Sequence, residues 1–439
     1  MGACIFNKTV NRLINAKFYR NVLKISQGTI IGQLIAAIAA PVILRLYTPE
    51  EYAVLGIYMS LLGITAVPAM LRYESAIPIC PDDIKAVNVF FLAQIIAFVI
   101  SIFCVVLLLV GKGVASIYLH IHKLLPYIWI IPLGMFLSAN YLLLVNWSIR
   151  QENYQAIAKT KITQSIGMVL FQIALGLAKI GPIGLLLGHV IGQSGGISTL
   201  VKPCMKFFRS SVSTVNVKSL TNVLNEYRRF PLFSMPASLL EAIGSNVPIL
   251  FFASIYSSEV VGWITFVQRI ICIPIYMLAG SIAQVYFGEL AKARYAEPEM
   301  LEVILLRRIK HLAFIGLLFV VVATALGSYF IPIIFGKNWN NASTCLIIMS
   351  PMILSAFISS PFGSTLDILQ RQDLHLIRDI IRFSIVVISL LLISYFNLQW
   401  LQGLIVWSIT GTVCSGVYLL MSFIAVRNFR YFNKMTINS

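Results

Sequence analysis

The sequence predicts an all-α, polytopic membrane protein with about twelve transmembrane helices in two six-helix lobes. Its composition, its long apolar blocks and its alternating positive charge predict this class. Hydrophobic residues make up 59% of the 439 residues, charged residues make up only 11%, and the mean hydropathy is +0.87. Soluble domains are about 45–50% apolar and about 25% charged. This composition excludes a chain that folds as two or three soluble domains.

The apolar residues fall in blocks of about 20 or more, the length that crosses a bilayer as a helix. Helix is the expected conformation because each span must satisfy its own backbone hydrogen bonds in lipid. Twelve such spans follow one another, at about 25–46, 53–72, 86–110, 124–146, 158–178, 182–203, 231–255, 260–286, 309–331, 344–366, 378–396 and 399–425.

Positive charge alternates between successive connecting segments. With the N-terminus inside, the cytoplasmic segments hold 27 of the 33 lysines and arginines. Positive charge stays on the cytoplasmic side during insertion, so both termini are expected to be cytoplasmic. The formal net charge of +17 is then a topology signal and an attraction to anionic membrane lipids, and no nucleic-acid partner is expected.

The chain divides into two similar halves. Residues 1–203 are the expected N-terminal six-helix lobe, 204–230 a cytoplasmic basic linker, and 231–439 the C-terminal six-helix lobe. "LYTPE" at 46–50 resembles "IYSSE" at 255–259, and each follows the first span of its half. Six plus six spans of equal orientation fit a two-lobe transporter built from parallel repeats.

Small residues recur at every fourth position in two spans. They form a smooth ridge that lets a neighbouring helix approach closely, either for static packing or for sliding. The residues are Gly184, Gly188, Gly192 and Gly196 in one span and Gly28, Gly32, Ala36 and Ala40 in the other.

Neither a cofactor nor a metal site is expected. The seven cysteines are scattered without a CxxC pair, and His120 and His122 do not share a helical face. The chain offers no readable catalytic triad, paired-carboxylate site or metal constellation, and every predicted outer loop is short. The sequence therefore predicts a protein that is not an enzyme.

Several blocks resemble one bacterial family over most of the chain. "RLYTPEEYAVLGIYMSLLGI" followed by "LRYESAIPI" resembles the start of the bacterial polysaccharide-unit flippases, the O-antigen (Wzx-type) members of the multidrug/oligosaccharidyl-lipid/polysaccharide exporter superfamily. "FPLFSMPASLLEAIGSNVPILFF" at 230–252, "GSIAQVYFGELAKA" at 280–293, "FGKNW" at 335–339 and "SSPFGSTLDILQRQ" at 359–372 resemble later parts of that family, in the expected order.

The resemblance implies two lobes around a central cavity that opens alternately to the cytoplasm and the periplasm. The implied substrate is an undecaprenyl-pyrophosphate-linked oligosaccharide carried across the bacterial inner membrane, for O-antigen or a related surface polysaccharide. Membrane lipids, a polysaccharide polymerase and a chain-length regulator are the other implied partners. Such cavities are often cationic, which suits a pyrophosphate.

Arg72 and Glu74 interrupt an otherwise apolar stretch. Arg72 is about 21 residues after Glu51, or roughly 32 Å along a helix, which places it at the cytoplasmic membrane boundary. It either snorkels to lipid headgroups with Glu74 solvated nearby, or it receives the pyrophosphate at the cavity mouth, since an arginine fork donates two parallel bonds. Arg45 is the mirror case at the periplasmic end of the first span. Arg371, Arg378 and Arg382 are interpreted as ordinary cytoplasmic charges.

Glu241 and Arg269 are the charges most clearly inside the membrane. Each would cost about 2.5–3.5 kcal/mol if it faced lipid, so both are expected to face the protein interior or the cavity. They either form a structural ion pair, or Arg269 attracts the pyrophosphate while Glu241 titrates and couples transport to an ion. Glu241 and Glu74 are therefore the two coupling candidates.

Three alternatives stay open. An oligosaccharide polymerase is also polytopic, but a long periplasmic loop with reactive groups would be expected. A drug/cation antiporter of the same superfamily would favour intramembrane acids over arginines. A lipid II-type flippase is a near relative with the same chemistry at its diphosphate.

Overall fold

The structure, a computed structural model, describes residues 27–119, 124–211, 215–272, 298–369 and 371–438, with scattered positions between 275 and 290. The basic segment before residue 27, His120 and His122 lie outside these residues.

The described residues form helices and contain no strand. The prediction of an all-α protein is confirmed. The α-helices are Gln27–Leu46, α2 (Pro49–Thr65), α3 (Asp83–Leu119), α4 (Ile130–Arg150), α5 (Tyr154–Leu177), α6 (Ile183–Ser194), α7 (Ile197–Ser211), α8 (Val217–Glu226), α9 (Met235–Ile255), α10 (Ser258–Phe266), α12 (Leu301–Phe335), α13 (Asn340–Ser359), α14 (Ser364–Ile368), α15 (Gln372–Tyr395) and α16 (Trp400–Asn438).

Ten helices of the described residues are long and apolar enough to cross a membrane, and they match ten of the predicted spans. The predicted span 260–286 runs into residues that the structure does not describe continuously. The predicted span 378–396 forms most of α15. This helix is not among the ten because every stretch of 18 residues in it contains three charged residues, Arg378, Asp379 and Arg382. These findings are consistent with twelve spans.

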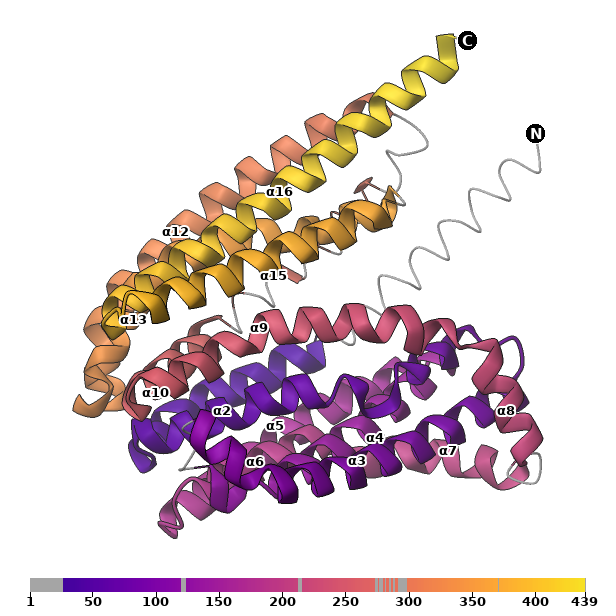
Figure 1. Ribbon diagram of the computed structural model, residues 1–439, viewed down its shortest axis with the longest axis horizontal. Coiled ribbons are helices and arrows are strands. Elements are labelled where there is room, and N and C mark those ends of the chain that lie inside the picture. Colours follow the sequence, from indigo (N-terminus) through magenta and orange to yellow (C-terminus); the bar gives the residue numbers. More distant parts are fainter. Residues whose placement is uncertain are drawn as a thin grey trace. The chain divides into compact units, whose positions relative to one another are not determined.

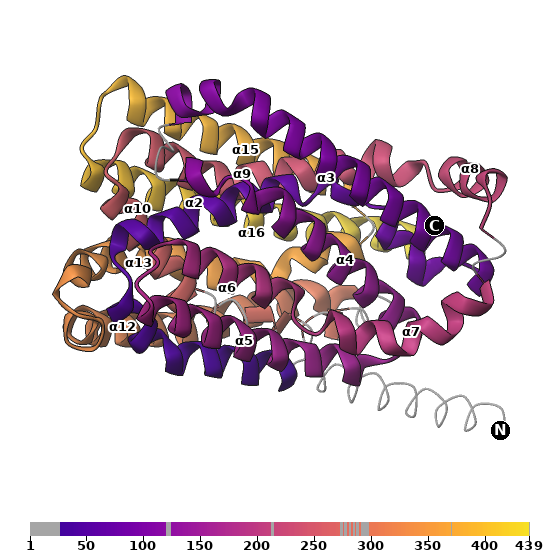
Figure 2. The same ribbon diagram turned by 90° about the horizontal axis from the view of Figure 1, so that it is seen from below.

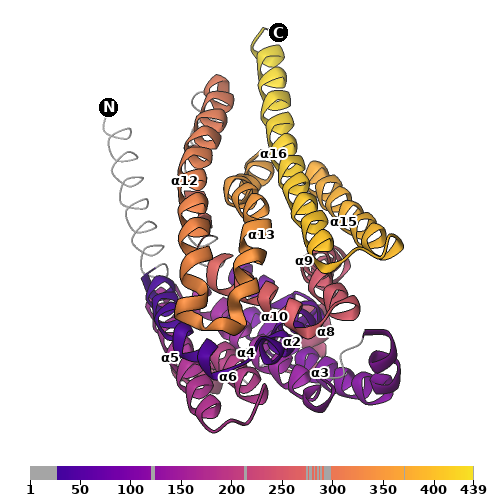
Figure 3. The same ribbon diagram turned by 90° about the vertical axis from the view of Figure 1, so that its left-hand side faces the viewer.

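The chain forms two compact lobes. One, here the N-terminal unit, contains the described residues within Met1–Leu46, Leu61–Val114 and His122–Leu239; the C-terminal unit contains those within Tyr47–Ser60, Ala115–Ile121 and Leu240–Ser439. In the N-terminal unit, α6 packs along α5 and α4 (Figure 2). In the C-terminal unit, α13 packs against both α12 and α16 (Figure 3), and α15 runs along α16 (Figure 1).

Both small-residue ridges of the N-terminal unit pack on α5. A Cβ at Gly32 would lie 2.7 Å from Ser165 Oγ, and a Cβ at Gly192 would lie 3.0 Å from Met168 Cβ. Gly196 has a φ of +85°, a backbone conformation that glycine adopts without strain, and it lies against Thr160. The four-residue spacing therefore serves close helix packing around α5.

The two repeated motifs begin α2 and α10, and these helices pack closely within the C-terminal unit. Thr48 and Glu51 cap the start of α2 reciprocally, with Thr48 N donating to Glu51 Oε2 over 2.9 Å. There is no room for a Cβ between Gly262 of α10 and the carbonyl of Pro49. Gly56 of α2 lies against the Thr265 side chain of α10. Gly56 is nine residues after the tyrosine of "LYTPE", and Thr265 is nine residues after the tyrosine of "IYSSE". Equivalent positions of the two repeats thus meet.

Candidate functional site

The chain leaves α2 through a strained junction that contains Arg72. The α-helix ends at Thr65 and is followed by two 3₁₀ segments, Pro68–Met70 and Tyr73–Ile79. Between them, Leu71 and Arg72 have φ values of 50° and 66°. Non-glycine residues in this region cost on the order of 1–3 kcal/mol each and persist where the surroundings impose them. The predicted span 53–72 matches the candidate membrane span Pro49–Met70, but its end is 3₁₀ rather than α-helical, and Arg72 lies just beyond it.

Glu74 is buried directly after this junction. It is 2% exposed, and its Oε1 lies 3.6 Å from Arg72 Nη1 and accepts a hydrogen bond from Ser75 Oγ over 3.3 Å. Glu74 Oε2 and Arg72 Nε are buried, and the described residues offer them no hydrogen-bond partner. Burial raises the pKa of the Glu74 carboxyl above its ordinary value, against the opposing effect of Arg72. The interpretation of Glu74 as solvated was wrong.

Contacts with α4 and α8 hold this junction in place. Arg150 of α4 donates to the carbonyls of Ile77 and Cys80 over 3.2 and 2.6 Å and pairs with Asp83 at 2.8 Å. Tyr73 donates its hydroxyl to the carbonyl of Leu224 in α8 over 3.1 Å. These contacts explain how a strained backbone and a buried carboxylate persist.

Arg269 lies on an irregular part of the helix that follows α10. Val267–Cys272 is π-helical, a conformation that occurs frequently at functional sites. The side chain is half-buried, and its Nη1 lies 3.5 Å from the thioether sulfur of Met59 in α2, a weak acceptor. Arg269 thus contacts α2 within the C-terminal unit.

Glu241 and Arg45 occupy more open positions. Glu241 lies on α9 in the C-terminal unit and is exposed, and none of the ion pairs between described residues joins it to Arg269. Arg45 is exposed one residue before the end of the helix Gln27–Leu46 in the N-terminal unit. Of the predicted site residues, the structure brings together only Arg72 and Glu74.

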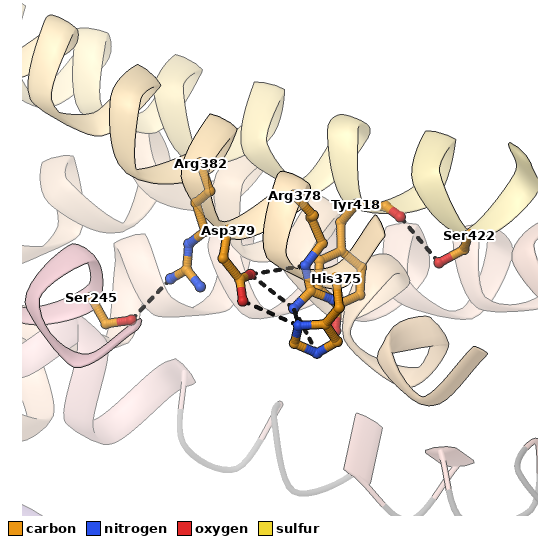
Figure 4. Close-up of polar contacts among 7 residues, drawn as sticks. All are labelled: Ser245, His375, Arg378, Asp379, Arg382, Tyr418 and Ser422. Atoms are coloured by element: carbon orange, nitrogen blue, oxygen red, sulfur yellow. Dashed lines mark hydrogen bonds and ion pairs between the residues drawn. The ribbon is translucent and has the colours of Figure 1, made fainter. Parts of the chain in front are cut away.

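A second charged cluster lies on α15, where sequence analysis predicted ordinary cytoplasmic charges (Figure 4). Arg378 is only 6% exposed. Its Nη2 lies 2.8 Å from Asp379 Oδ1 and 3.0 Å from His375 Nε2, and its guanidinium stacks 4.3 Å from the Tyr418 ring centre. One turn further on, Arg382 donates to Ser245 Oγ of α9 over 2.9 Å. The burial of Arg378 was not predicted, and its position on the cytoplasmic side stays a prediction.

No group of three or more histidine, cysteine or acidic residues among the described positions could hold a metal ion. The charged clusters of the two lobes contain arginines, which can bind an anion, and carboxylates, which can accept a proton. They are the Arg72–Glu74 junction in the N-terminal unit, and Arg269 and the α15 cluster in the C-terminal unit.

The chain matches one known protein family over most of its length. Residues 42–344 match the family described as polysaccharide biosynthesis protein. A search of curated protein sequences gives no match.

Several solved structures share the fold at low sequence identity. A multidrug resistance MATE family transporter of the MOP superfamily, in an inward-facing conformation, aligns with a TM-score of 0.72 and 16% identity over 94% of this chain and 99% of its own. The lipid II flippase MurJ aligns with a TM-score of 0.65 and 14% identity over 91% of this chain and 87% of its own. A MOP superfamily transporter from Pyrococcus furiosus aligns with a TM-score of 0.53 and 14% identity, covering 93% and 96%. This chain therefore has the two-lobe fold of that superfamily.

Proposed function

Because this chain belongs to the polysaccharide biosynthesis protein family, we propose that it is a flippase for undecaprenyl-pyrophosphate-linked oligosaccharide units of O-antigen or a related surface polysaccharide. It carries them across the bacterial inner membrane by alternating access. The observation that carries the proposal is the family match over residues 42–344 of a chain with a multi-pass transporter fold. This activity accounts for the membrane-spanning helices, the transporter fold and the polysaccharide biosynthesis family together.

The diphosphate is the part of the substrate that crosses the apolar core least easily. An arginine suits it because the planar guanidinium donates parallel charge-assisted hydrogen bonds to phosphate oxygens. Arg269 is half-buried on the π-helical segment Val267–Cys272, and its Nη1 donates to the thioether of Met59, a weak acceptor that a phosphate oxygen can replace. We assign Arg269 to the diphosphate within the membrane, with Arg72 and Arg45 at the two predicted membrane boundaries.

Two carboxylates are assigned to energy coupling. Glu74 is already destabilised in its ionised form by burial, so a change in its surroundings shifts its protonation readily. A phosphate that draws Arg72 away would remove the opposite charge at 3.6 Å and favour proton uptake by Glu74. Glu241 is the second coupling residue, acting without a direct ion pair to Arg269.

The proposal also places the protein among its partners. Its substrate arrives from cytoplasmic assembly on the lipid carrier, and its product faces the periplasm, where the polymerase and the chain-length regulator use it. Both termini then lie in the cytoplasm.

Deletion of the gene tests the proposal in cells. Short lipid-linked oligosaccharides should accumulate facing the cytoplasm, and surface polysaccharide should be lost. Sidedness is measured by whether an impermeant periplasmic glycosidase can digest the units before lysis. Units that are digestible in intact cells would mean that translocation proceeds without this protein.

The lipid II-type flippase is the second candidate, favoured by the structural similarity to MurJ. The two functions separate in the same deletion strain. Loss of surface polysaccharide with normal growth and normal peptidoglycan favours the oligosaccharide substrate. Accumulated lipid II with lysis favours the alternative.

A further inference from the structure

We propose that the α15 cluster is a second phosphate-binding site, in which Arg378 and Arg382 hold the phosphate of a lipid headgroup. Its occupant is the diphosphate of the transported lipid, which rests on the proposed function, or the phosphate of a membrane phospholipid. The two sources share the chemistry that an arginine fork recognises.

The first argument is the unused hydrogen-bonding capacity of Arg378. Its Nε and Nη2 engage Asp379, with Nε donating to Oδ1 over 3.0 Å, while its Nη1 is buried and the described residues offer it no acceptor. A buried donor without a partner is costly, more so on a charged group. The arginine is therefore held in a state that an additional acceptor would stabilise.

The second argument is the charge balance along the helix. Arg378 and Arg382 are four residues apart, so they lie one above the other on one face. Asp379 neutralises only one of them, and Arg382 has a neutral hydroxyl as its hydrogen-bond acceptor. No ion pair between described residues includes Arg382. This face of α15 thus carries one positive charge in excess.

The third argument is the fixed orientation of the guanidinium. The Tyr418 ring covers one face at 4.3 Å, and the Tyr418 hydroxyl lies against Gly363, where there is no room for a Cβ. Figure 4 shows the ring beneath Arg378 and the Arg382 side chain reaching toward α9. A stacked, oriented arginine loses less freedom when its fork binds two oxygens of a phosphate. Because Nη1 is buried in the present conformation, binding requires the groups that cover it to move aside.

The test uses the full-length protein in phosphatidylcholine nanodiscs, with thermal stabilisation by undecaprenyl pyrophosphate as the readout. Arg378→Gln should bind at least about tenfold more weakly than wild type, the scale of a lost charge-assisted contact. Arg307→Gln removes an exposed arginine of α12 in the same unit and should bind like wild type.

The variant Asp379→Asn distinguishes a phosphate-binding role of Arg378 from a purely structural role in holding α15. Asparagine keeps one oxygen acceptor but removes the negative charge that competes with a phosphate for Nε and Nη2, so the affinity for undecaprenyl pyrophosphate should rise above wild type. If Arg378 only secured α15, the variant would lose stability without any gain in affinity, and the proposal would be overturned. This variant also decides the question if Arg378→Gln fails to fold.

A second arm replaces undecaprenyl pyrophosphate with phosphatidylglycerol in the nanodisc. If phosphatidylglycerol stabilises the wild-type protein but not Arg378→Gln, and undecaprenyl pyrophosphate shows no such difference, the site binds the phosphate of a membrane phospholipid. This result supports the proposed phosphate site. Equal binding by wild type and Arg378→Gln in both arms overturns the inference. If wild type still binds undecaprenyl pyrophosphate in that case, the proposed flippase function stands without this site.

Discussion

Glu74 is an ionisable side chain in a buried position, where its charged form is disfavoured. Its raised pKa means that the folded protein binds this proton more tightly than the unfolded chain. Stability therefore falls as pH rises from the ordinary glutamate pKa through the raised one, and stays lower above it. Each unit of displacement is worth about 1.4 kcal/mol.

Glu74→Gln should remove this pH dependence. The variant should be more stable than wild type above the raised pKa, and the two should converge at acid pH, where wild-type Glu74 is protonated. Thermal unfolding of the detergent-solubilised proteins across this range measures the difference. Parallel curves at every pH would show that Glu74 does not titrate in the folded state.

Arg269 is expected to act on the substrate rather than on the fold. Arg269→Gln should reach normal membrane levels, as a role in transport rather than in folding predicts. Surface polysaccharide should fall by about 10- to 100-fold, since hydrogen bonds to charged groups are worth about 1.5–3 kcal/mol. Addition of Glu241→Gln should not restore export, because no ion pair between described residues joins the two. Wild-type export from the single variant would remove Arg269 from the mechanism.

At the scale of elements, the packing of α2 on α10 depends on glycine. Gly262→Ala places a methyl group against the backbone carbonyl of Pro49, which cannot rotate away. Overpacking of this kind costs about 1–3 kcal/mol, so membrane yield and thermal stability should both fall. Gly416→Ala on α16 is the control, because no atom lies within 4 Å of the added Cβ. Equal losses in the two variants would contradict close packing at Gly262.

Some elements could be predicted from the sequence because lipid restricts the chain to long helices. Ten spans and the all-helical class follow from length and hydropathy alone. The break after Thr65 could not be predicted, because Leu71 and Arg72 are ordinary residues with no preference for positive φ. The π-helical turn at Arg269 also has no sequence signal. Arg378 looked like any cytoplasmic arginine, because its burial depends on Tyr418, 40 residues away in the sequence.

At the scale of the whole molecule, the charge distribution predicts a topology. Both termini and the segment near 204–230 should be cytoplasmic, with residues 111–123 and 337–343 periplasmic. Reporter fusions at Lys206 and Lys337 should therefore report opposite sides of the membrane. The same side for both would contradict the arrangement of twelve spans.

The most direct test of the flippase proposal is translocation by the purified protein. Undecaprenyl-pyrophosphate-linked oligosaccharide extracted from the deletion strain is reconstituted with the full-length protein in liposomes, and an impermeant glycosidase digests the outward-facing units. Liposomes with the wild-type protein should expose nearly all units with time, and protein-free liposomes should stop at the outer-leaflet fraction. Liposomes with Arg269→Gln should expose the inner units about 10- to 100-fold more slowly than wild type. Digestion that stops at this fraction with the wild-type protein, under an imposed proton or sodium gradient of either direction, would contradict the flippase function.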